Sequence, residues 1–253
     1  SMIRPLPFSQ ASENNKRVIL EVLARHLTGG DSVLEIGGGS GQHAVFFATC
    51  FRELHWQSSD ISSNVDSLNL RISAAQLPNL PAAISLDVND PDWSCPCCNV
   101  IYSANSLHIM STASVEKFFS GAGTKLRDNG VLLAYGPFKY DGAFTTESNA
   151  HFDLWLKDRD PRSGVRDFEW VNGLAGSAGL SLIEDNAMPA NNQFLVGETW
   201  VVYSRKLRQN QIWDMWVTLI LQCQHQRIQA MPQEMNCNYQ QVRAVQLVVF
   251  QIF

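Results

Sequence analysis

Ser32-Val33-Leu34-Glu35-Ile36-Gly37-Gly38-Gly39-Ser40-Gly41 is a short apolar run that passes directly into a glycine-rich turn. The residues that follow, 42–48, have the pattern of a helix. An apolar strand, a glycine turn and a helix form the first βα unit of a nucleotide-binding sheet. Glycine is needed where the chain turns sharply and a ligand approaches the backbone, because a Cβ would collide there. The stretch therefore predicts an α/β domain with a ligand site at the end of its first strand.

Two cofactor motifs compete for these glycines. Residues 39–44 satisfy the permissive dinucleotide fingerprint G-x-G-x-x-G/A, which would indicate an NAD-dependent oxidoreductase. The first motif of class I S-adenosylmethionine-dependent methyltransferases is apolar-acid-apolar-G-x-G-x-G, and the chain fills it with Glu35, Gly37, Gly39 and Gly41. A carboxylate at this point repels a pyrophosphate but accepts a hydrogen bond from the ammonium of a methionine moiety. The stretch thus resembles the methyltransferases. The alternative to a cofactor site is a glycine-rich turn that binds no ligand.

The composition narrows the class of protein. The 253 residues fit one large α/β domain with additions, and the net charge of −5 gives no case for a nucleic-acid surface. No segment reaches the roughly 18–20 apolar residues of a membrane span. Six cysteines without a recognisable signal peptide indicate no disulfide framework. We therefore expect a cytoplasmic protein, with the nucleus as an alternative location, and no membrane or nucleic-acid partner.

An acid ends the expected second strand, residues 53–60. This residue, Asp60, lies near the ~20-residue offset after Glu35 at which a carboxylate meets ribose hydroxyls. A carboxylate can accept hydrogen bonds from both hydroxyls of a cis-diol, so we predict ribose binding by Asp60, against the alternative of an ordinary helix N-cap.

A third acid follows the next expected elements, a helix over residues 65–77 and a strand over 82–86. In the methyltransferases that the chain resembles, an acid at this place receives the adenine amino group, often with the neighbouring backbone amide. The resemblance therefore implies that Asp87 and Val88 bind adenine.

The fourth strand is predicted over residues 100–104 and runs into Asn105 and His108. Ligands meet the carboxyl ends of central strands in open α/β sheets, so these side chains would stand beside the transferable methyl group. His108 is the candidate base, because an ordinary imidazole titrates near neutral pH. A structural role is as common for a lone histidine. Cys95 and Cys98, just before this strand, have zinc-ligand spacing, but no second pair follows, and we interpret them as loop residues with no metal.

The rest of the domain is predicted as alternating helices and strands. Helices are expected over residues 9–27, 114–127 and 168–178, with Asp128-Asn129-Gly130 ending the second of these. Strands are expected over residues 131–135, 179–183 and 193–203, joined by loops at 136–139 and 187–192. The long polar tract 139–170 is predicted to carry substrate contacts.

Several signatures together resemble one group, the methyltransferase-like twenty-six family, over residues 8–205. They are Asn15-Lys16, Gly39-Ser40-Gly41-Gln42-His43-Ala44, Trp56-Gln57-Ser58-Ser59-Asp60, Tyr135-Gly136-Pro137-Phe138, Asn149, Phe152-Asp153, Arg166-Asp167 and Met188-Pro189-Ala190-Asn191-Asn192. The resemblance implies a Rossmann-like class I methyltransferase fold: a mostly parallel seven-stranded sheet with its last strand antiparallel and helices on both faces. It names no substrate. Gly197-Glu198-Thr199-Trp200 departs from the family pattern, which leaves the register of the last strand open.

The sequence thus predicts a methyltransferase domain over residues 1–205 and an atypical, Gln-rich tail over 206–253. The predicted cofactor is S-adenosylmethionine and the acceptor a small polar molecule. A non-catalytic protein that binds this cofactor or its product S-adenosylhomocysteine is the first alternative, and the NAD-dependent oxidoreductase the second. The predicted cofactor-binding residues are Glu35, Gly37, Gly39, Gly41, Gln42, Asp60, Asp87, Val88 and Asn105. The predicted catalytic residues are His108, Asn105 and Tyr135. The predicted acceptor-side residues are Lys139, Asn149, Asp153, Arg166, Asn191 and Asn192.

Overall fold

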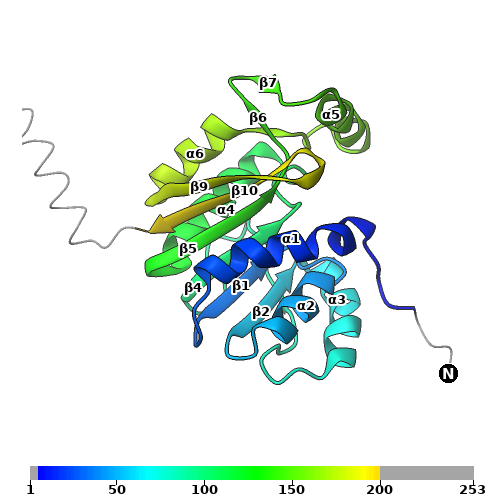
Figure 1. Ribbon diagram of the computed structural model, residues 1–253, viewed down its shortest axis with the longest axis vertical. Helices are drawn as coiled ribbons and strands as arrows, with labels where there is room; N and C mark the ends of the chain where they lie inside the picture. Colours follow the sequence, from blue (N-terminus) through cyan, green and yellow to red (C-terminus); the bar gives the residue numbers. More distant parts are fainter. Residues whose placement is uncertain (1–4, 200–253) are drawn as a thin grey trace, which may run out of the picture. The chain divides into compact units, whose positions relative to one another are not determined.

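The computed structural model describes residues 5–199, which fold around one seven-stranded sheet (Figure 1). Its strand order is β3-β2-β1-β4-β5-β10-β9. Neighbouring strands from β3 to β5 are parallel, whereas β10 is antiparallel to both β5 and β9. The predicted class I methyltransferase architecture is confirmed. The strands are β1 (Ser32–Ile36), β2 (His55–Asp60), β3 (Ile84–Ser85), β4 (Cys98–Ala104), β5 (Leu126–Gly136), β9 (Leu180–Met188) and β10 (Asn192–Thr199).

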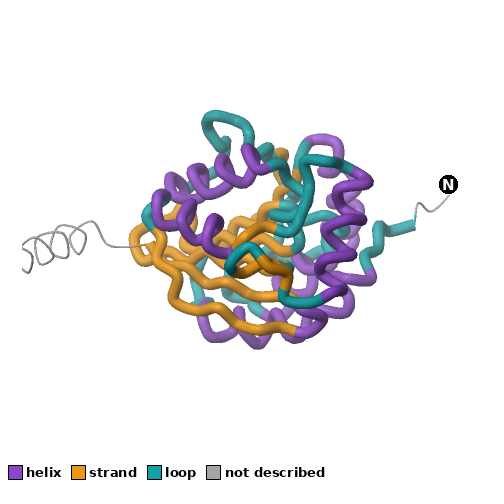
Figure 2. Tube along the Cα trace, turned by 90° about the horizontal axis from the view of Figure 1, so that it is seen from above, coloured by secondary structure: helices purple, strands orange, loops and turns teal. Residues whose placement is uncertain are grey.

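Helices cover both faces of this sheet (Figure 2). Alternation along β1 explains why: Val33 packs into the core with one set of helices, and Leu34 and Ile36 pack into the core with the other. A strand that is buried on both faces needs apolar residues at successive positions, which is the pattern of the apolar run. The first set of helices is α1 (Gln10–His26), α2 (Gln42–Cys50) and α3 (Ser62–Ala75), and the second is α4 (Thr112–Lys125) and α6 (Phe168–Ser177).

A small second sheet occupies the tract between β5 and α6, where the sequence predicted loops. It has the order β7-β6-β8, and α5 (Glu147–Arg159) lies within the same tract. The prediction of a loop over residues 136–139 is wrong at its end, because Phe138 pairs with Arg166 in β8. Such pairing between residues far apart in sequence leaves no local signal. The strands are β6 (Phe138–Tyr140), β7 (Ala143–Phe144) and β8 (Arg166–Asp167).

Two predicted boundaries are corrected in the second half of the sheet. Asp128-Asn129-Gly130 does not end α4; the helix stops at Lys125, and β5 already begins at Leu126, which is buried opposite Cys98 of β4. The strand predicted over residues 179–183 continues to Met188. It is an edge strand with an exposed side, so its charged residues do not interrupt it.

The last described strand confirms the expected hairpin. The turn is shorter than predicted, a 3₁₀ turn over Pro189–Asn191, and β10 follows with a register shift between Val196 and Gly197. Within residues 5–199, no helix has both the length and the apolar character needed to cross a membrane. The predicted tail, 206–253, lies outside the described residues.

Candidate functional site

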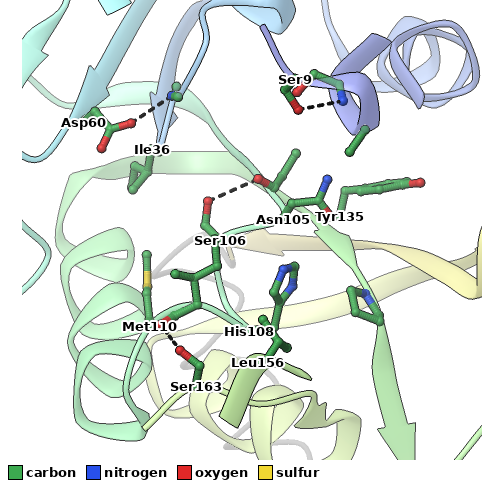
Figure 3. A pocket seen from close by; sticks show the side chains of 18 of the residues that line it. Ser9, Ile36, Asp60, Asn105, Ser106, His108, Met110, Tyr135, Leu156 and Ser163 are labelled. Atoms are coloured by element: carbon green, nitrogen blue, oxygen red, sulfur yellow. Dashed lines mark hydrogen bonds between the residues drawn. The ribbon is translucent and has the colours of Figure 1, made fainter. Parts of the chain in front are cut away.

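A cavity of about 1390 Å³ opens at the carboxyl ends of the parallel strands (Figure 3). It lies beside β1 and β4, where the strand order reverses, and ligands of open α/β sheets bind at such a switch point. Pockets for one small molecule measure roughly 300–1,000 Å³. The cavity therefore has room for a cofactor and an acceptor side by side.

The glycine turn forms one wall of this cavity. Gly37 and Gly39 have φ of 79° and 54°, a left-handed conformation that side chains disfavour. A Cβ on Gly38 would lie 2.3 Å from the Ser58 Oγ. The backbone N–H groups of Gly37 and Gly38 donate to the Ser59 carbonyl at 3.0 and 2.9 Å, which fixes the turn against β2. The predicted sharp turn is thus present, and the approach of a ligand to it stays a prediction.

Glu35 is a buried carboxylate that lines the cavity. Its Oε2 accepts hydrogen bonds from the Ser58 hydroxyl at 2.6 Å and from the Trp56 indole N–H at 3.2 Å. Burial raises the pKa of Glu35 to about 7, and the charge of Asp60 acts in the same direction. A buried anion that no cation neutralises costs stability, so a cationic ligand group beside Glu35 would recover that cost.

Glu35→Gln is expected to stabilise the ligand-free protein at pH 8 much more than at pH 5. The folded state keeps its proton up to about pH 7, whereas an unfolded glutamate loses it near 4.5. The stabilisation from protonated Glu35 is therefore complete below pH 4.5 and is lost as the pH rises through 7, by about 3 kcal/mol in all. Urea unfolding of both proteins between pH 5 and 8 measures this. Glu116→Gln, at an exposed position of α4, is the control; parallel profiles for Glu35→Gln and wild type would contradict the prediction.

Asp60 stands at the end of β2 and is buried at the cavity wall. Its Oδ2 accepts from the Gly39 N–H at 2.8 Å, and its Oδ1 accepts from the Ile61 N–H at 2.8 Å and the Asn64 side chain at 3.0 Å. Asp87 and Val88 also line the cavity, and Asp87 Oδ1 accepts from the Asn89 N–H at 2.9 Å. The three predicted acids therefore surround one space.

Asn105, His108 and Tyr135 meet at the opposite wall (Figure 3). Asn105 has φ of 56°, and its N–H donates to the Tyr135 carbonyl at 2.8 Å, which joins the ends of β4 and β5. Burial, and then the charge of Arg166, lower the pKa of His108 to about 4, so its imidazole is neutral at physiological pH. Burial raises the pKa of the Tyr135 hydroxyl, and the side chains of Asn15 and Asn192 act in the opposite direction.

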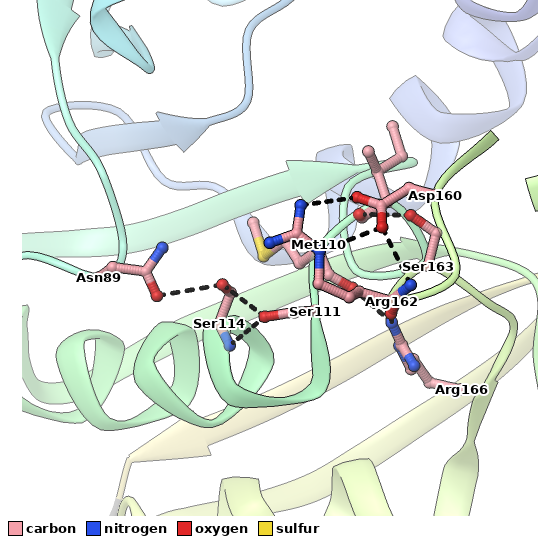
Figure 4. Close-up of polar contacts among 9 residues, drawn as sticks. Asn89, Met110, Ser111, Ser114, Asp160, Arg162, Ser163 and Arg166 are labelled. Atoms are coloured by element: carbon pink, nitrogen blue, oxygen red, sulfur yellow. Dashed lines mark hydrogen bonds and ion pairs between the residues drawn. The ribbon is translucent and has the colours of Figure 1, made fainter. Parts of the chain in front are cut away.

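Residues 162–166 hold the loop that carries His108 in place (Figure 4). The Arg166 guanidinium donates to the carbonyls of Leu107 and Met110, and the Gly164 N–H donates to the His108 carbonyl at 2.9 Å. The Ser163 hydroxyl donates to the Ile109 carbonyl at 2.8 Å. These contacts fix the backbone that positions the imidazole.

Six predicted site residues do not line the cavity, and their observed contacts are structural. Gly41 begins α2 with φ of 75°, and Gln42 accepts from the Ser9 N–H at 2.6 Å. The remaining four make contacts within the tract after β5 or to its neighbours. Lys139 forms an ion pair with Asp167, and Asp153 accepts a hydrogen bond from the Val165 N–H and forms an ion pair with Lys157. Arg166 holds the His108 loop, and the Asn191 side chain donates to Ser148. Asn149 and Asn192 do line the cavity, as predicted.

The sequence did not assign several residues that the structure brings to the site. On α1, Ser12 and Asn15 line the cavity. The Asn15 side chain lies 2.7 Å from the Nε2 atom of His43, and the Nδ1 atom of the same ring lies 2.9 Å from the Tyr102 hydroxyl. On α5, Phe152, Trp155, Leu156 and Arg159 also line it. Their i, i+3, i+4, i+7 spacing is a signal that could have identified a single helix face.

The Cys-x-x-Cys segment lies outside this cavity. Cys98 is the first residue of β4, not a loop residue as predicted, and burial raises the pKa of its thiol to about 12. Its thiol is therefore protonated near neutral pH. Among residues 5–199, no group of three or more His, Cys, Asp or Glu side chains is placed to hold a metal ion.

The family model described as "Protein of unknown function (DUF938)" matches residues 6–198 of the chain. The fold is similar to that of an O-methyltransferase family protein from Burkholderia thailandensis, with a TM-score of 0.67 and 19% identity over 76% of this chain and 57% of that one. Human N-acetylserotonin methyltransferase in complex with SAM gives a TM-score of 0.64 and 14% identity, over 76% of this chain and 53% of that one.

An O-methyltransferase family 2 protein from Planctomyces limnophilus, in complex with apigenin, gives a TM-score of 0.60 and 16% identity over 74% of this chain and 62% of that one. The chain thus spans little more than half of the length of the first two of these solved structures. At these identities the likeness establishes the fold.

Proposed function

The chain belongs to the family described as protein of unknown function (DUF938), and we propose that it is an S-adenosylmethionine-dependent methyltransferase. One observation carries the proposal: Glu35, Asp60 and Asp87, three acids from three strand ends, line a single cavity beside a glycine turn. Acids suit the ammonium, ribose and adenine groups of this cofactor, whereas a dinucleotide would bring a pyrophosphate to Glu35. The sequence motifs and the fold support the same assignment.

The residues fit this cofactor in type and in place. Asp60 would accept hydrogen bonds from the ribose hydroxyls, Glu35 would face the ammonium group, and Asp87 with Val88 would hold the adenine. The glycine turn lets the cofactor approach the backbone. When bound, S-adenosylmethionine supplies an electrophilic methyl group on a sulfonium. The chain's own contribution would then be to align a nucleophile with that group and to receive its proton.

His108 would act as the base at the acceptor side. An imidazole with a pKa near 4 is a weak base, but an oxygen that has just gained a methyl group is far more acidic than an imidazolium. A neutral His108 can therefore take the proton as the new bond forms. The two similar O-methyltransferase family proteins favour an oxygen nucleophile. Asn105, Tyr135, Asn149 and Asn192 would contact the acceptor, which we propose is a small molecule with polar groups.

The resemblance to the methyltransferase-like twenty-six family is part of this proposal. Two alternatives have separate signatures. A non-catalytic protein would bind the cofactor or its product with the same motifs and would transfer no methyl group. An NAD-dependent oxidoreductase would change the fluorescence of NADH and ignore S-adenosylhomocysteine.

Calorimetric titration of S-adenosylmethionine and S-adenosylhomocysteine into the protein, with NAD as the control ligand, tests the cofactor. We expect dissociation constants in the micromolar range, about −8 kcal/mol, for the first two ligands and no heat from NAD. Binding should strengthen from pH 6 to pH 8, because the burial-raised pKa of Glu35, about 7, keeps the carboxyl neutral at the lower pH. A folded sample that binds NAD in preference to both sulfur ligands would overturn the proposal.

A further inference from the structure

The cavity changes character between its two ends. Glu35, Asp60 and Asp87 line the cofactor end, whereas α5 brings Phe152, Trp155, Leu156 and Arg159 to the other end. These four residues follow the i, i+3, i+4, i+7 spacing of one helix face. Leu156 and His108 both line the cavity (Figure 3). The acceptor therefore meets a surface of different chemistry from that which meets the cofactor.

Aromatic groups form a continuous series along this face. The His108 and Phe152 rings lie edge to face with centroids 5.2 Å apart. Phe152 and Trp155 are stacked, with centroids 5.7 Å apart and an interplanar angle of 18°. The Arg159 guanidinium carbon lies 4.2 Å from the centroid of the Trp155 ring. The series thus runs from the candidate base, through two π faces, to a cation.

The outer half of this series is open to a ligand. Trp155 lines the cavity and is 50% exposed, so its ring is accessible to a ligand there. Within residues 5–199, no carboxylate lies within ion-pair distance of Arg159. Nearby Asp160 pairs instead with Arg162, at 2.9 Å (Figure 4). Arg159 therefore presents a positive charge that stacking orients and no described residue neutralises.

We propose, resting on the proposed methyltransferase function, that the methyl acceptor is a planar hydroxylated aromatic acid. Its ring would lie against Phe152 and Trp155, with its anionic group at Arg159 and its hydroxyl at His108. Seven residues of helix separate Phe152 from Arg159, a rise of about 10 Å. A fused or extended ring system spans this length better than a single ring. Guanidinium and carboxylate form paired hydrogen bonds, which would orient the acceptor.

The reaction balances with the groups present. The acceptor oxygen forms the new O–CH₃ bond as the S–CH₃ bond breaks, and the electron pair of the broken bond stays on sulfur. The phenolic proton passes to a ring nitrogen of His108 and from there to solvent. The products are a methyl ether and S-adenosylhomocysteine, and no oxidant or metal is required.

Calorimetry with saturating S-adenosylhomocysteine present tests the proposal with two probes, 6-hydroxy-2-naphthoate and 2-naphthol. We expect the wild-type protein to bind the acid at least ten-fold more tightly than the naphthol. Arg159→Gln should abolish this preference and leave the naphthol affinity unchanged, whereas Trp155→Leu should weaken both probes by about ten-fold. Matched controls are Arg17→Gln, at an exposed position of α1, and Leu154→Ala, on α5 outside the cavity lining; neither should alter binding.

The outcomes separate this proposal from the one on which it rests. Equal affinity for the two probes, or an equal loss for both in Arg159→Gln, overturns the aromatic acid while the cofactor assignment stands. Binding of S-adenosylhomocysteine without binding of either probe has the same consequence. Failure of the folded protein to bind S-adenosylhomocysteine overturns both. Trp155→Leu that keeps full affinity for both probes removes the stacking role.

Discussion

Asp60→Ala is expected to weaken S-adenosylmethionine binding by about 100-fold, or about 3 kcal/mol. The substitution removes the proposed acceptor of the ribose hydroxyls. It also releases the Gly39 N–H, which donates to Asp60 Oδ2 at 2.8 Å, and so loosens the glycine turn on which the cofactor would lie. Both losses occur at a buried position, where polar interactions are strong. Calorimetric titration measures the change.

Asn64→Ala is the control for this experiment, because it removes one donor to the same carboxylate and leaves the carboxylate in place. We expect it to cost less than ten-fold in affinity. Circular dichroism and thermal unfolding establish that each variant is folded. A folded Asp60→Ala protein with wild-type affinity would remove Asp60 from the ribose role.

His108→Ala is expected to lower the rate of methyl transfer by about 100-fold while cofactor affinity stays within about two-fold of wild type. This is the low end of the range for a general base, in keeping with the lowered pKa of the imidazole. Among residues 5–199, no hydrogen bond of 3.5 Å or less engages its ring nitrogens, so the ring is available to an acceptor. S-adenosylhomocysteine formation, followed with an acceptor that turns over, measures the rate.

The pH profile checks the protonation state expected of His108, and a conservative variant distinguishes a base from a residue that only forms hydrogen bonds. Because the pKa of His108 is about 4, the ring stays neutral from pH 8 down to pH 5. With cofactor saturating, the rate should not fall over this range through protonation of His108. His108→Gln keeps a hydrogen-bonding group but has no basic nitrogen, so its rate should stay near that of His108→Ala, and a wild-type rate would point to a hydrogen-bonding role instead. His55→Ala, at an exposed position of β2, should leave the rate unchanged. A His108→Ala protein with full turnover would exclude the base.

The cofactor half of the site was predictable because its signals are local. The apolar run and the glycines from Gly37 to Gly41 specify a strand and a turn within ten residues. Asp60 ends the second strand and Asp87 follows the third, and parallel strands bring their carboxyl ends to one edge. The position of each acid in sequence therefore implies its position in space. The roles assigned to these acids remain predictions that ligand binding must test.

The acceptor half was predicted less well, because its geometry depends on contacts between distant residues. Arg166 was expected at the acceptor, but it holds the carbonyls of Leu107 and Met110, a contact that no periodic pattern reveals. Asp153 was chosen for its charge and is used to anchor the Val165 N–H. Polar residues in a long tract are as suitable for supporting a loop as for binding a ligand, and residue type alone does not separate the two.

The second sheet has a consequence for how such a protein can diversify. Residues 138–167, which contain β6, β7, α5 and β8, contribute no strand to the seven-stranded sheet. Side-chain bonds hold this tract in place: Asn149 donates to the Asn191 carbonyl and Asn191 to Ser148, which tie α5 to the hairpin tip. The tract is thus an insertion between β5 and α6 that adds nothing to the seven-stranded sheet. Under the proposed function, changes within its inward face would alter which molecules are accepted, while the strands that carry Glu35, Asp60 and Asp87 keep their register. Acceptor choice and cofactor use would then be able to evolve, or be engineered, as separate traits.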